Sequence, residues 1–343
     1  MSGRPTALAE RSRRTLTSPT FCARRIELKS NSMSPKVSII LPYYEGLRWL
    51  PRAVESVRQQ TEKAWELIVV DDGSIEDPGP FLQRLDDDRV RLLRINHAGK
   101  GAALNHGVGN ARGEMVCFID QDDIMLPVRL TTQLRGSERE RHADGVYSDY
   151  ERRYEGGLLI DQFISWQVTP EEAIHQMAVG RSPVTMQTIM LKKAFYEKLG
   201  GFSDNSEITG LDDLEFFVRL FLAQPVMVYA PGVVQGWVLH ERNYSKTRDF
   251  QEARLHWLTR LADLAQLHPM LEKELKHYRF HSHCMRGMYF LESGCAGYAV
   301  PDLFKALRLK PSSLNTCYLL IKALILTTAR CFGVNVLAAK INR

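Results

Sequence analysis

The chain has 343 residues, of which 44% are hydrophobic and 25% are charged. This is ordinary globular usage, and it excludes a disordered, collagen-like or disulfide-scaffold protein. The charge is uneven: residues 1–35 hold seven Lys and Arg against two Glu, and residues 303–343 hold seven with no acid, so residues 36–302 are net acidic. An acidic body argues against wrapping of nucleic acid, whereas basic ends are typical of contact with a membrane surface or a polyanionic partner, or of plain solvation.

The first 35 residues are rich in Ser, Thr and Arg and contain no apolar stretch of the kind found in a secretory signal. We expect a disordered basic tail here. An organellar transit peptide would need an amphipathic stripe that the segment lacks, and Met33 is an alternative start. The six cysteines form no CxxC pair, which predicts reduced thiols in a cytoplasmic protein.

Between residues 36 and 135, apolar β-branched runs alternate with helix-like stretches. The runs predicted as strands are Val37–Leu41, Leu67–Val70, Val90–Ile95 and Met115–Ile119, and the predicted helices are Leu47–Gln60 and Gly101–Ala111. Such alternation indicates an α/β fold with a mainly parallel central sheet flanked by helices. Ligands of such sheets bind beyond the carboxyl ends of the strands.

Residues 136–248 show a more mixed pattern. Val146–Tyr154 and Leu158–Phe163 flank a Glu-Gly-Gly turn and predict a hairpin. Further predicted elements are strands at Gln187–Leu191, Val226–Tyr229 and Val233–Val238 and a helix at Leu211–Ala223.

Residues 249–343 are predicted to form a C-terminal helical region. Within it, Asn315–Ala339 is mostly apolar but is interrupted by Lys322 and Arg330. Two interior cations argue against a membrane span, which needs about 20 predominantly apolar residues. The pattern favours a basic amphipathic helix on an anionic membrane, or a helix packed on the rest of the protein.

Acidic residues follow two of the predicted strands. Asp71 and Asp72 come after the second strand, and Asp120, Asp122 and Asp123 come after the fourth. Carboxylates gathered at one edge of a sheet repel unless a cation or hydrogen-bond donors hold them. Mg²⁺ and Mn²⁺ take oxygen ligands and bridge carboxylate to phosphate, so a metal–diphosphate site is predicted. The alternative is that these acids cap turns and helices.

The chain resembles the family 2 glycosyltransferases, which have the GT-A nucleotide-sugar fold. The segments that carry the resemblance are Val37–Tyr44 (VSIILPYY), Val69–Ser74 (VVDDGS), Asn96–Asn105 (NHAGKGAALN), Gly113–Asp123 (GEMVCFIDQDD), Gly200–Ser203 (GGFS) and Leu211–Leu220 (LDDLEFFVRL). They occur in the family's order over roughly residues 36–245. The resemblance divides this region into a nucleotide-sugar half, 36–135, and an acceptor half, 136–248.

The resemblance implies roles for particular residues. Those expected to bind the nucleotide-sugar are Pro42, Tyr44, Glu45, Asp71, Asp72, Gly99, Lys100 and Asp120. Asp120 and Asp122 form the DxD pair, with Mn²⁺ or Mg²⁺ expected on Asp122 and Asp120 and with His240 as a further ligand. Asp213 is the expected general base, and Asp212 beside it is the other expected catalytic residue. Arg242 and Ser245, in the loop with His240, are expected near phosphate or metal, although a solvated loop is the alternative.

Two departures from the family pattern affect these roles. Glu45 stands where the family often has Asn, and Asp212-Asp213 replaces a common Glu-Asp pair, which leaves open which acid is the base. Both acids are predicted to open a helix, whose dipole favours the ionised form and lowers basicity. They would then need a desolvated pocket to act as bases. Charge complementarity at the helix start is the alternative role.

Other motifs are rejected. Gly107–Gly113 imitates a dinucleotide fingerprint but precedes a strand, and no GxxxxGK[ST] loop occurs. His277, His281 and Cys284 would share one helical face beside His283, yet no second cluster completes a tetrahedral zinc site, and packing or solvation explains them. The QxxRW motif of processive polysaccharide synthases is absent, which favours addition of single sugars.

The predicted function is therefore inverting, metal-dependent transfer of a hexosyl or N-acetylhexosaminyl group from a nucleotide-sugar, by default a UDP-sugar, to a hydroxyl of a glycan or lipid-linked acceptor. We expect a cytoplasmic location, peripheral membrane contact through the basic C-terminal helices and a role in cell-envelope polysaccharide synthesis. The alternatives are a non-catalytic nucleotide-sugar or glycan-binding relative and a sugar nucleotidyltransferase.

Overall fold

The computed structural model describes residues 34–243 and 247–331. The strands are β1 (Val37–Tyr43), β2 (Trp65–Asp71), β3 (Val90–Arg94), β4 (Met115–Phe118), β5 (Ile124–Met125), β6 (Gly145–Tyr154), β7 (Leu159–Phe163), β8 (Ile189–Lys192) and β9 (Met227–Leu239). The helices of the first part are α1 (Leu50–Arg58), α2 (Gly79–Gln83), α3 (Lys100–Gly109), α4 (Arg129–Arg139), α5 (Pro170–Ala178), α6 (Lys193–Lys198) and α7 (Asp212–Leu222), with 3-10 turns η1 (Met186–Thr188) and η2 (Ser206–Ile208). The last four are α8 (Arg248–Leu267), α9 (Pro269–Glu292), α10 (Ala296–Leu309) and α11 (Leu314–Cys331).

The first half of the sheet is parallel. The strands run in the order β3-β2-β1-β4, and β1 pairs in parallel with both β2 and β4. The predicted strands and the helices between them are confirmed, with boundaries that differ by a few residues. Because parallel strands end at the same edge, the segments after β1, β2 and β4 lie next to one another.

The second half of the sheet is mixed. β8 is antiparallel to β4 and to β6, β9 runs parallel to β6, and β6–β7 is the predicted hairpin. The two strands predicted between Val226 and Val238 are one strand, β9, with a register shift opposite Asp149. At that shift Gly232 has φ +138°, and the Asp149 carboxylate accepts hydrogen bonds from the Gly232 N–H and the Tyr229 hydroxyl, at 2.8 Å each.

Alternate residues of the parallel strands serve two different cores. Ile39 and Leu41 of β1 belong to one core with α1 and α4, whereas Ile40 belongs to the other core, which includes residues of α3, α5, α7, α8 and α9. Such strands, buried on both sides, read as the continuous apolar runs seen in the sequence. The two cores pack on both faces of the sheet and so fix the positions of the strand ends that precede the acidic segments.

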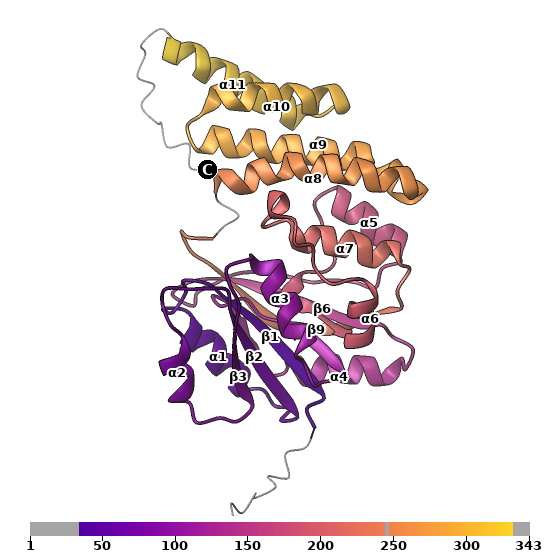
Figure 1. The fold of residues 1–343 in the computed structure, drawn as a ribbon. Coiled ribbons are helices and arrows are strands. Elements are labelled where there is room, and N and C mark those ends of the chain that lie inside the picture. Colours follow the sequence, from indigo (N-terminus) through magenta and orange to yellow (C-terminus); the bar gives the residue numbers. More distant parts are fainter. Residues whose placement is uncertain (1–33, 244–246, 332–343) are drawn as a thin grey trace, which may run out of the picture. The chain divides into compact units, whose positions relative to one another are not determined.

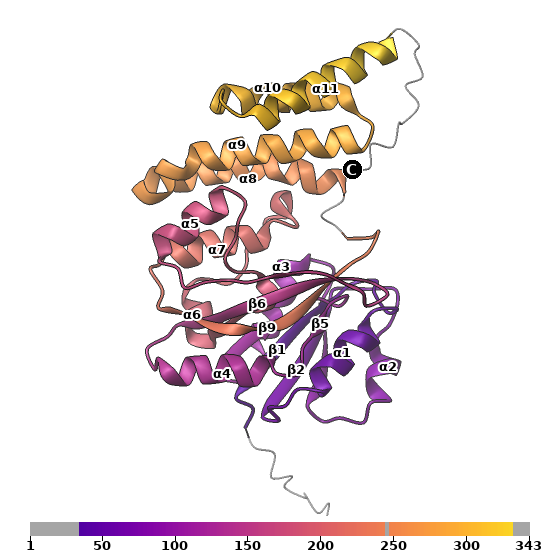
Figure 2. The same ribbon diagram turned by 180° about the vertical axis from the view of Figure 1, so that it is seen from behind.

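The chain beyond Arg248 is helical as far as the structure describes it, as predicted. In Figures 1 and 2, α5 and α7 lie between the sheet and the helices α8 to α11, and α5 packs against both α7 and α9. No helix in the described ranges is long and apolar enough to cross a membrane. The tail 1–33 and residues 332–343, on which other predictions fall, lie outside the described residues.

The described residues belong to one compact unit that begins at Ser34. The finer divisions at residues 135/136 and 248/249 stay predictions. Cys117, Cys284, Cys295 and Cys317 carry free thiols.

Candidate active site

A cavity of about 1080 Å³ opens at the carboxyl ends of the parallel strands. This volume is slightly larger than that of typical small-molecule sites, about 300–1,000 Å³. The predicted site residues that line it are Pro42, Tyr44, Glu45, Asp72, Gly99, Lys100, Asp120, Asp122, Asp212, Asp213, His240 and Arg242. Residues from both halves of the sheet therefore converge on one space. Ser245 lies outside the described residues.

Asp71 is not among the lining residues. Its buried carboxylate accepts a hydrogen bond from the Ser74 N–H at 2.9 Å and lies 3.5 Å from Arg94 Nε. Asp71 therefore shapes the turn after β2.

Asp72 organises the wall that leads into α3. Its two carboxylate oxygens accept hydrogen bonds from the N–H groups of Ala98 and Gly99, at 2.8 and 2.9 Å. Gly99 precedes α3 with φ +91°, a conformation that side chains disfavour. The His97 ring stacks on Tyr44, with ring centroids 4.4 Å apart, so the Asp72 contacts also fix one flat face of the cavity.

Glu45, the departure from the family pattern, ties two loops together. Its carboxylate accepts hydrogen bonds from the N–H groups of Ile75 at 2.7 Å and Glu76 at 3.3 Å, and its backbone has φ +46°. The longer side chain thus spans from the segment after β1 to the segment after β2. Glu45 therefore stabilises the packing of these two segments at the rim of the cavity.

Lys100 and Asp120 form an ion pair in the middle of the cavity. Lys100 Nζ lies 2.7 Å from Asp120 Oδ1, and Gln187 Nε2 donates to Asp120 Oδ2 at 2.6 Å. Burial raises the pKa of Asp120 although Lys100 partly offsets the effect. Burial would lower the pKa of Lys100, but the carboxylates of Asp120 and Asp212 outweigh it and raise that pKa. Lys100 is therefore a permanent cation in the cavity.

Asp122 and His240 lie side by side at the far end of the acidic segment. His240 Nε2 is 2.8 Å from Asp122 Oδ2, and the His240 ring stacks on Trp49 with centroids 4.6 Å apart. Next to them, burial and the charges of Asp122 and Asp120 raise the pKa of Asp123 well above its usual range. Asp123 Oδ1 accepts from the Val238 N–H at 2.9 Å, whereas its buried Oδ2 has no hydrogen-bond partner. The local excess of negative charge is a setting that suits a cation.

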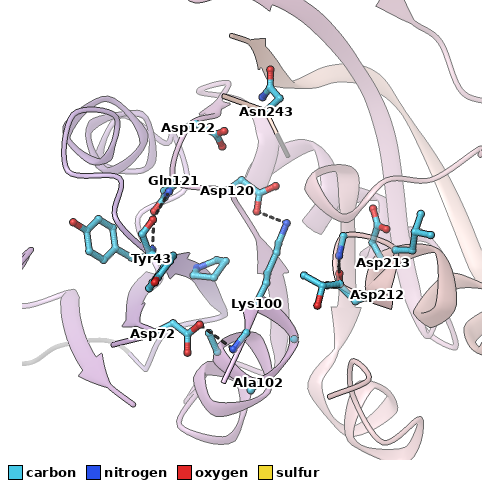
Figure 3. Close-up of a pocket in the computed structure, with 18 of the residues that line it drawn as sticks. Tyr43, Asp72, Lys100, Ala102, Asp120, Gln121, Asp122, Asp212, Asp213 and Asn243 are labelled. Carbon is cyan, nitrogen blue, oxygen red and sulfur yellow. Dashed lines mark hydrogen bonds and ion pairs between the residues drawn. The ribbon is translucent and has the colours of Figure 1, made fainter. Parts of the chain in front are cut away.

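Asp212 and Asp213 begin α7 on the other side of Lys100 (Figure 3). Asp212 Oδ1 accepts from the Gly210 N–H at 2.8 Å, which fixes this carboxylate in the turn before the helix. Burial and the neighbouring Asp212 charge raise the pKa of Asp213 to about 6, although Lys100 opposes them. Burial therefore outweighs the helix dipole, and Asp213 has the pKa of a usable base near neutral pH.

Sequence reasoning missed several residues that build this site. Gln187, predicted in a strand, lies in η1 and holds Asp120. Gln121 exchanges two hydrogen bonds with the backbone of Tyr44, at 2.9 and 3.0 Å. Arg129, fully buried, donates to the carbonyls of Phe118 and Ile189 and to the Gln235 side chain at 2.9–3.2 Å. An Arg in the polar pattern of α4 gave no signal of this role.

Comparison with known proteins identifies the family. Residues 38–199 match the family model described as glycosyl transferase family 2. EpsE of Bacillus subtilis (strain 168), a protein assigned to the glycosyltransferases, is 31% identical over 197 residues, which are 54% of this chain and 67% of EpsE. The chain belongs to glycosyl transferase family 2. An uncharacterized glycosyltransferase of Rickettsia felis is 32% identical over 160 residues, and the match spans 25% of that longer protein.

Solved structures of another protein have a similar fold. S. aureus TarS, residues 1–349, superimposes with a TM-score of 0.58 at 16% sequence identity, and the alignment covers 87% of this chain and 92% of TarS 1–349. TarS 1–349 has also been crystallised in complex with UDP and with UDP-GlcNAc. The predicted α/β GT-A fold is confirmed.

The donor set at Asp122 and His240 fits a divalent cation. One carboxylate oxygen and one imidazole nitrogen stand 2.8 Å apart, and Asp123 Oδ2 is buried without a hydrogen-bond partner. Oxygen-rich sites with an added imidazole accept Mn²⁺, and sites with few protein ligands leave positions for substrate phosphate. Asp120 is engaged with Lys100 and Gln187.

Proposed function

We propose that this family 2 protein transfers a hexosyl or N-acetylhexosaminyl group from a UDP-sugar to a hydroxyl of a glycan or lipid-linked acceptor, with inversion and with a divalent cation. The UDP complexes of TarS support the choice of donor, since that protein has the same fold. The observation that carries the proposal is that one cavity holds three kinds of group. These are the Asp122–His240 pair, which could bind a divalent cation, the charged amine of Lys100, and the Asp213 carboxylate with a pKa of about 6.

The chain's own residues account for the steps as follows. The donor lies along Tyr44, Asp72 and Gly99, with its diphosphate near Lys100, whose charge offsets that of the phosphates. A divalent cation held by Asp122 and His240 would supply further positive charge to the departing diphosphate. Asp213 takes the proton of the acceptor hydroxyl as that oxygen bonds to the anomeric carbon. The bond from that carbon to the diphosphate oxygen breaks on the opposite face, so the configuration inverts and UDP leaves.

A thermal-shift titration tests this proposal. We expect UDP with Mn²⁺, at about a hundredfold excess over its dissociation constant, to raise the melting temperature by roughly 5 °C, because ligand bound only to the folded state adds about 2.7 kcal/mol. The rise should vanish in EDTA and in Asp122→Ala. Parallel titrations with GDP, dTDP and NAD identify the base.

The outcomes of product analysis distinguish the proposal from its alternatives. A transferase releases UDP from the UDP-sugar when acceptor is present, whereas a nucleotidyltransferase releases pyrophosphate from a nucleoside triphosphate and a sugar phosphate. A binding relative would show the thermal shift with no turnover on any acceptor. A folded protein that responds to no nucleoside diphosphate contradicts the metal–diphosphate site.

We also propose peripheral membrane contact through α10 and α11, which suits a lipid-linked acceptor on the cytoplasmic face. The exposed apolar side chains of these helices are Tyr298, Phe304, Leu314, Tyr318, Ile321, Leu324 and Ile325. Exposed Lys322 lies among them, and a basic apolar surface of this kind favours anionic lipid.

Vesicle co-sedimentation tests the membrane contact. Because each buried Ile contributes about 1.5–3 kcal/mol, Ile321→Glu/Ile325→Glu should bind vesicles containing phosphatidylserine at least about tenfold more weakly than the unmodified chain. Leu158→Glu/Leu159→Glu, in the β6–β7 hairpin, is the matched control and should bind normally. Equal binding of both variants contradicts a contact through α11.

A further inference from the structure

Three metal-ligating side chains meet where α5 packs against α9, away from the cavity. His175 comes from α5, and Glu274 and His277 come from α9. Glu274 Oε2 lies 2.9 Å from Nδ1 of His175 and 2.9 Å from Nδ1 of His277. The ligand atoms of all three lie within 4.8 Å of one another. One carboxylate oxygen thus faces two imidazoles from different helices.

The packing of the two helices sets this arrangement. Glu274 and His277 are three residues apart, so they share a face of α9. Beside them Tyr278 is buried, and its hydroxyl donates to the Ile174 carbonyl at 3.4 Å, which aligns α5 with α9. His175 directly follows Ile174 and stands at the rim of this contact.

The rim position leaves the cluster open to an ion from solvent. The side-chain exposures are 45% for His175, 48% for His277 and 18% for Glu274. A tetrahedral Zn²⁺ with bonds of about 2.0–2.1 Å holds its ligand atoms roughly 3.3 Å apart. The two observed nitrogen–oxygen separations of 2.9 Å need to open by only a few tenths of an ångström. Each imidazole would keep its proton on Nε2 and offer the Nδ1 lone pair.

The other candidates on α9 do not join the cluster. His283 Nδ1 lies 2.7 Å from Asp302 Oδ1, and Cys284 Sγ lies 3.5 Å from Thr316 Oγ1. Burial lowers the pKa of His281 to about 4, so that imidazole is neutral, and its ring packs against Gly180 beyond the end of α5. By sequence, His277 was considered only with its neighbours on the same helix and a zinc site there was rejected, because the partner His175 lies about 100 residues earlier.

We propose that His175, Glu274 and His277 bind Zn²⁺ or a similar transition-metal ion, with water in the fourth position. Two imidazoles and one carboxylate are a common zinc set, and nitrogen donors disfavour Mg²⁺ and Ca²⁺. The ion joins α5 to α9 and thereby braces α7, because α5 also packs against the helix that begins with Asp212 and Asp213. The site requires no donor or acceptor, so it stands apart from the transferase proposal.

Calorimetric titration of the metal-free full chain with ZnCl₂ tests the site. His175→Ala/His277→Ala should weaken zinc binding more than about a hundredfold, since loss of an outer-shell partner alone costs 10–100-fold. It should also abolish the zinc-dependent rise in melting temperature. His106→Ala/His142→Ala removes two exposed histidines elsewhere and should leave both unchanged. Titrating each protein in an Asp122→Ala background removes competition from the active site.

Cobalt absorption and a second variant make the result decisive. Co²⁺ should give the strong visible bands of a four-coordinate site in the unmodified chain and in the His106/His142 variant, and weak bands in the double variant. If the double variant does not fold, Glu274→Gln, which preserves shape but removes the charge, answers the same question. Zinc affinity that is equal in the unmodified chain and in a folded His175/His277 or Glu274 variant overturns the proposal.

Discussion

Asp213→Asn is expected to lower kcat by about a thousandfold while leaving the dissociation constant for UDP with Mn²⁺ unchanged. General-base catalysis contributes roughly 10²–10⁴-fold, and the amide cannot accept the acceptor's proton. Asp213 lies across Lys100 from the Asp120 side of the cavity (Figure 3), so its loss should spare the donor contacts. Steady-state kinetics measures the change in kcat, and calorimetric titration with UDP and Mn²⁺ measures the dissociation constant.

Asp212→Asn is the matched control for this prediction. The Asp212 carboxylate is tied to the Gly210 N–H, and an amide oxygen still accepts that bond, so turnover should fall far less than in Asp213→Asn. A larger loss in Asp212→Asn would instead assign the base to Asp212. Turnover equal to that of the unmodified chain in both Asp213→Asn and Asp212→Asn would contradict a general base at this helix start.

Although Asp213→Asn should lower turnover, we expect it to stabilise the folded chain at high pH. The pKa of Asp213 is raised from 3.8 to about 6 in the folded chain, so its contribution to stability is present at low pH and is lost as pH rises through 6. At pH 8 the ionised, half-buried carboxylate destabilises the fold, and asparagine removes that cost. The variant should therefore melt no lower than the unmodified chain at pH 8, a trade of stability for activity that is common at active sites.

The parallel half of the fold was predictable because its signal is local. Strands such as β1 and β2 are buried on both faces, so each appears as one apolar run that ends in a turn. β9 was predicted as two strands because Pro231 and Gly232 interrupt its pattern. Asp149, more than 80 residues earlier, holds the chain extended through that point. A long-range hydrogen bond of this kind leaves no trace in local periodicity.

The same distinction applies to the site. Asp72, Asp120 and Asp122 follow strands directly, so the topology alone brings them together. Gln187 and His240 arrive from the second half of the sheet, and His240 was inferred only from family resemblance. Gln187 was missed because its role depends on how β8 pairs with β4, a contact between residues far apart in sequence.

The acid limb of the pH profile of kcat/KM is expected at about pH 6. Asp213 must be ionised to accept a proton, and its pKa in the free enzyme is about 6; kcat/KM reports the free enzyme. The groups that act on it are Asp212 on its own helix, Lys100 and Asp120 across the cavity, and Arg254 of α8. Activity should be level above pH 7 and fall tenfold per unit below 6, to roughly one hundredth at pH 4.

Replacing Asp213 separates this titration from that of the other acids. The residual activity of Asp213→Asn should lack the limb at pH 6, because the titrating carboxylate is gone. Lys100→Met should move the limb to higher pH in whatever activity remains, since Lys100 lowers the pKa of Asp213. Circular dichroism at each pH confirms that the chain stays folded. A limb near pH 4 in the folded, unmodified chain would mean that Asp213 titrates like an exposed carboxyl, and burial would then not supply its basicity.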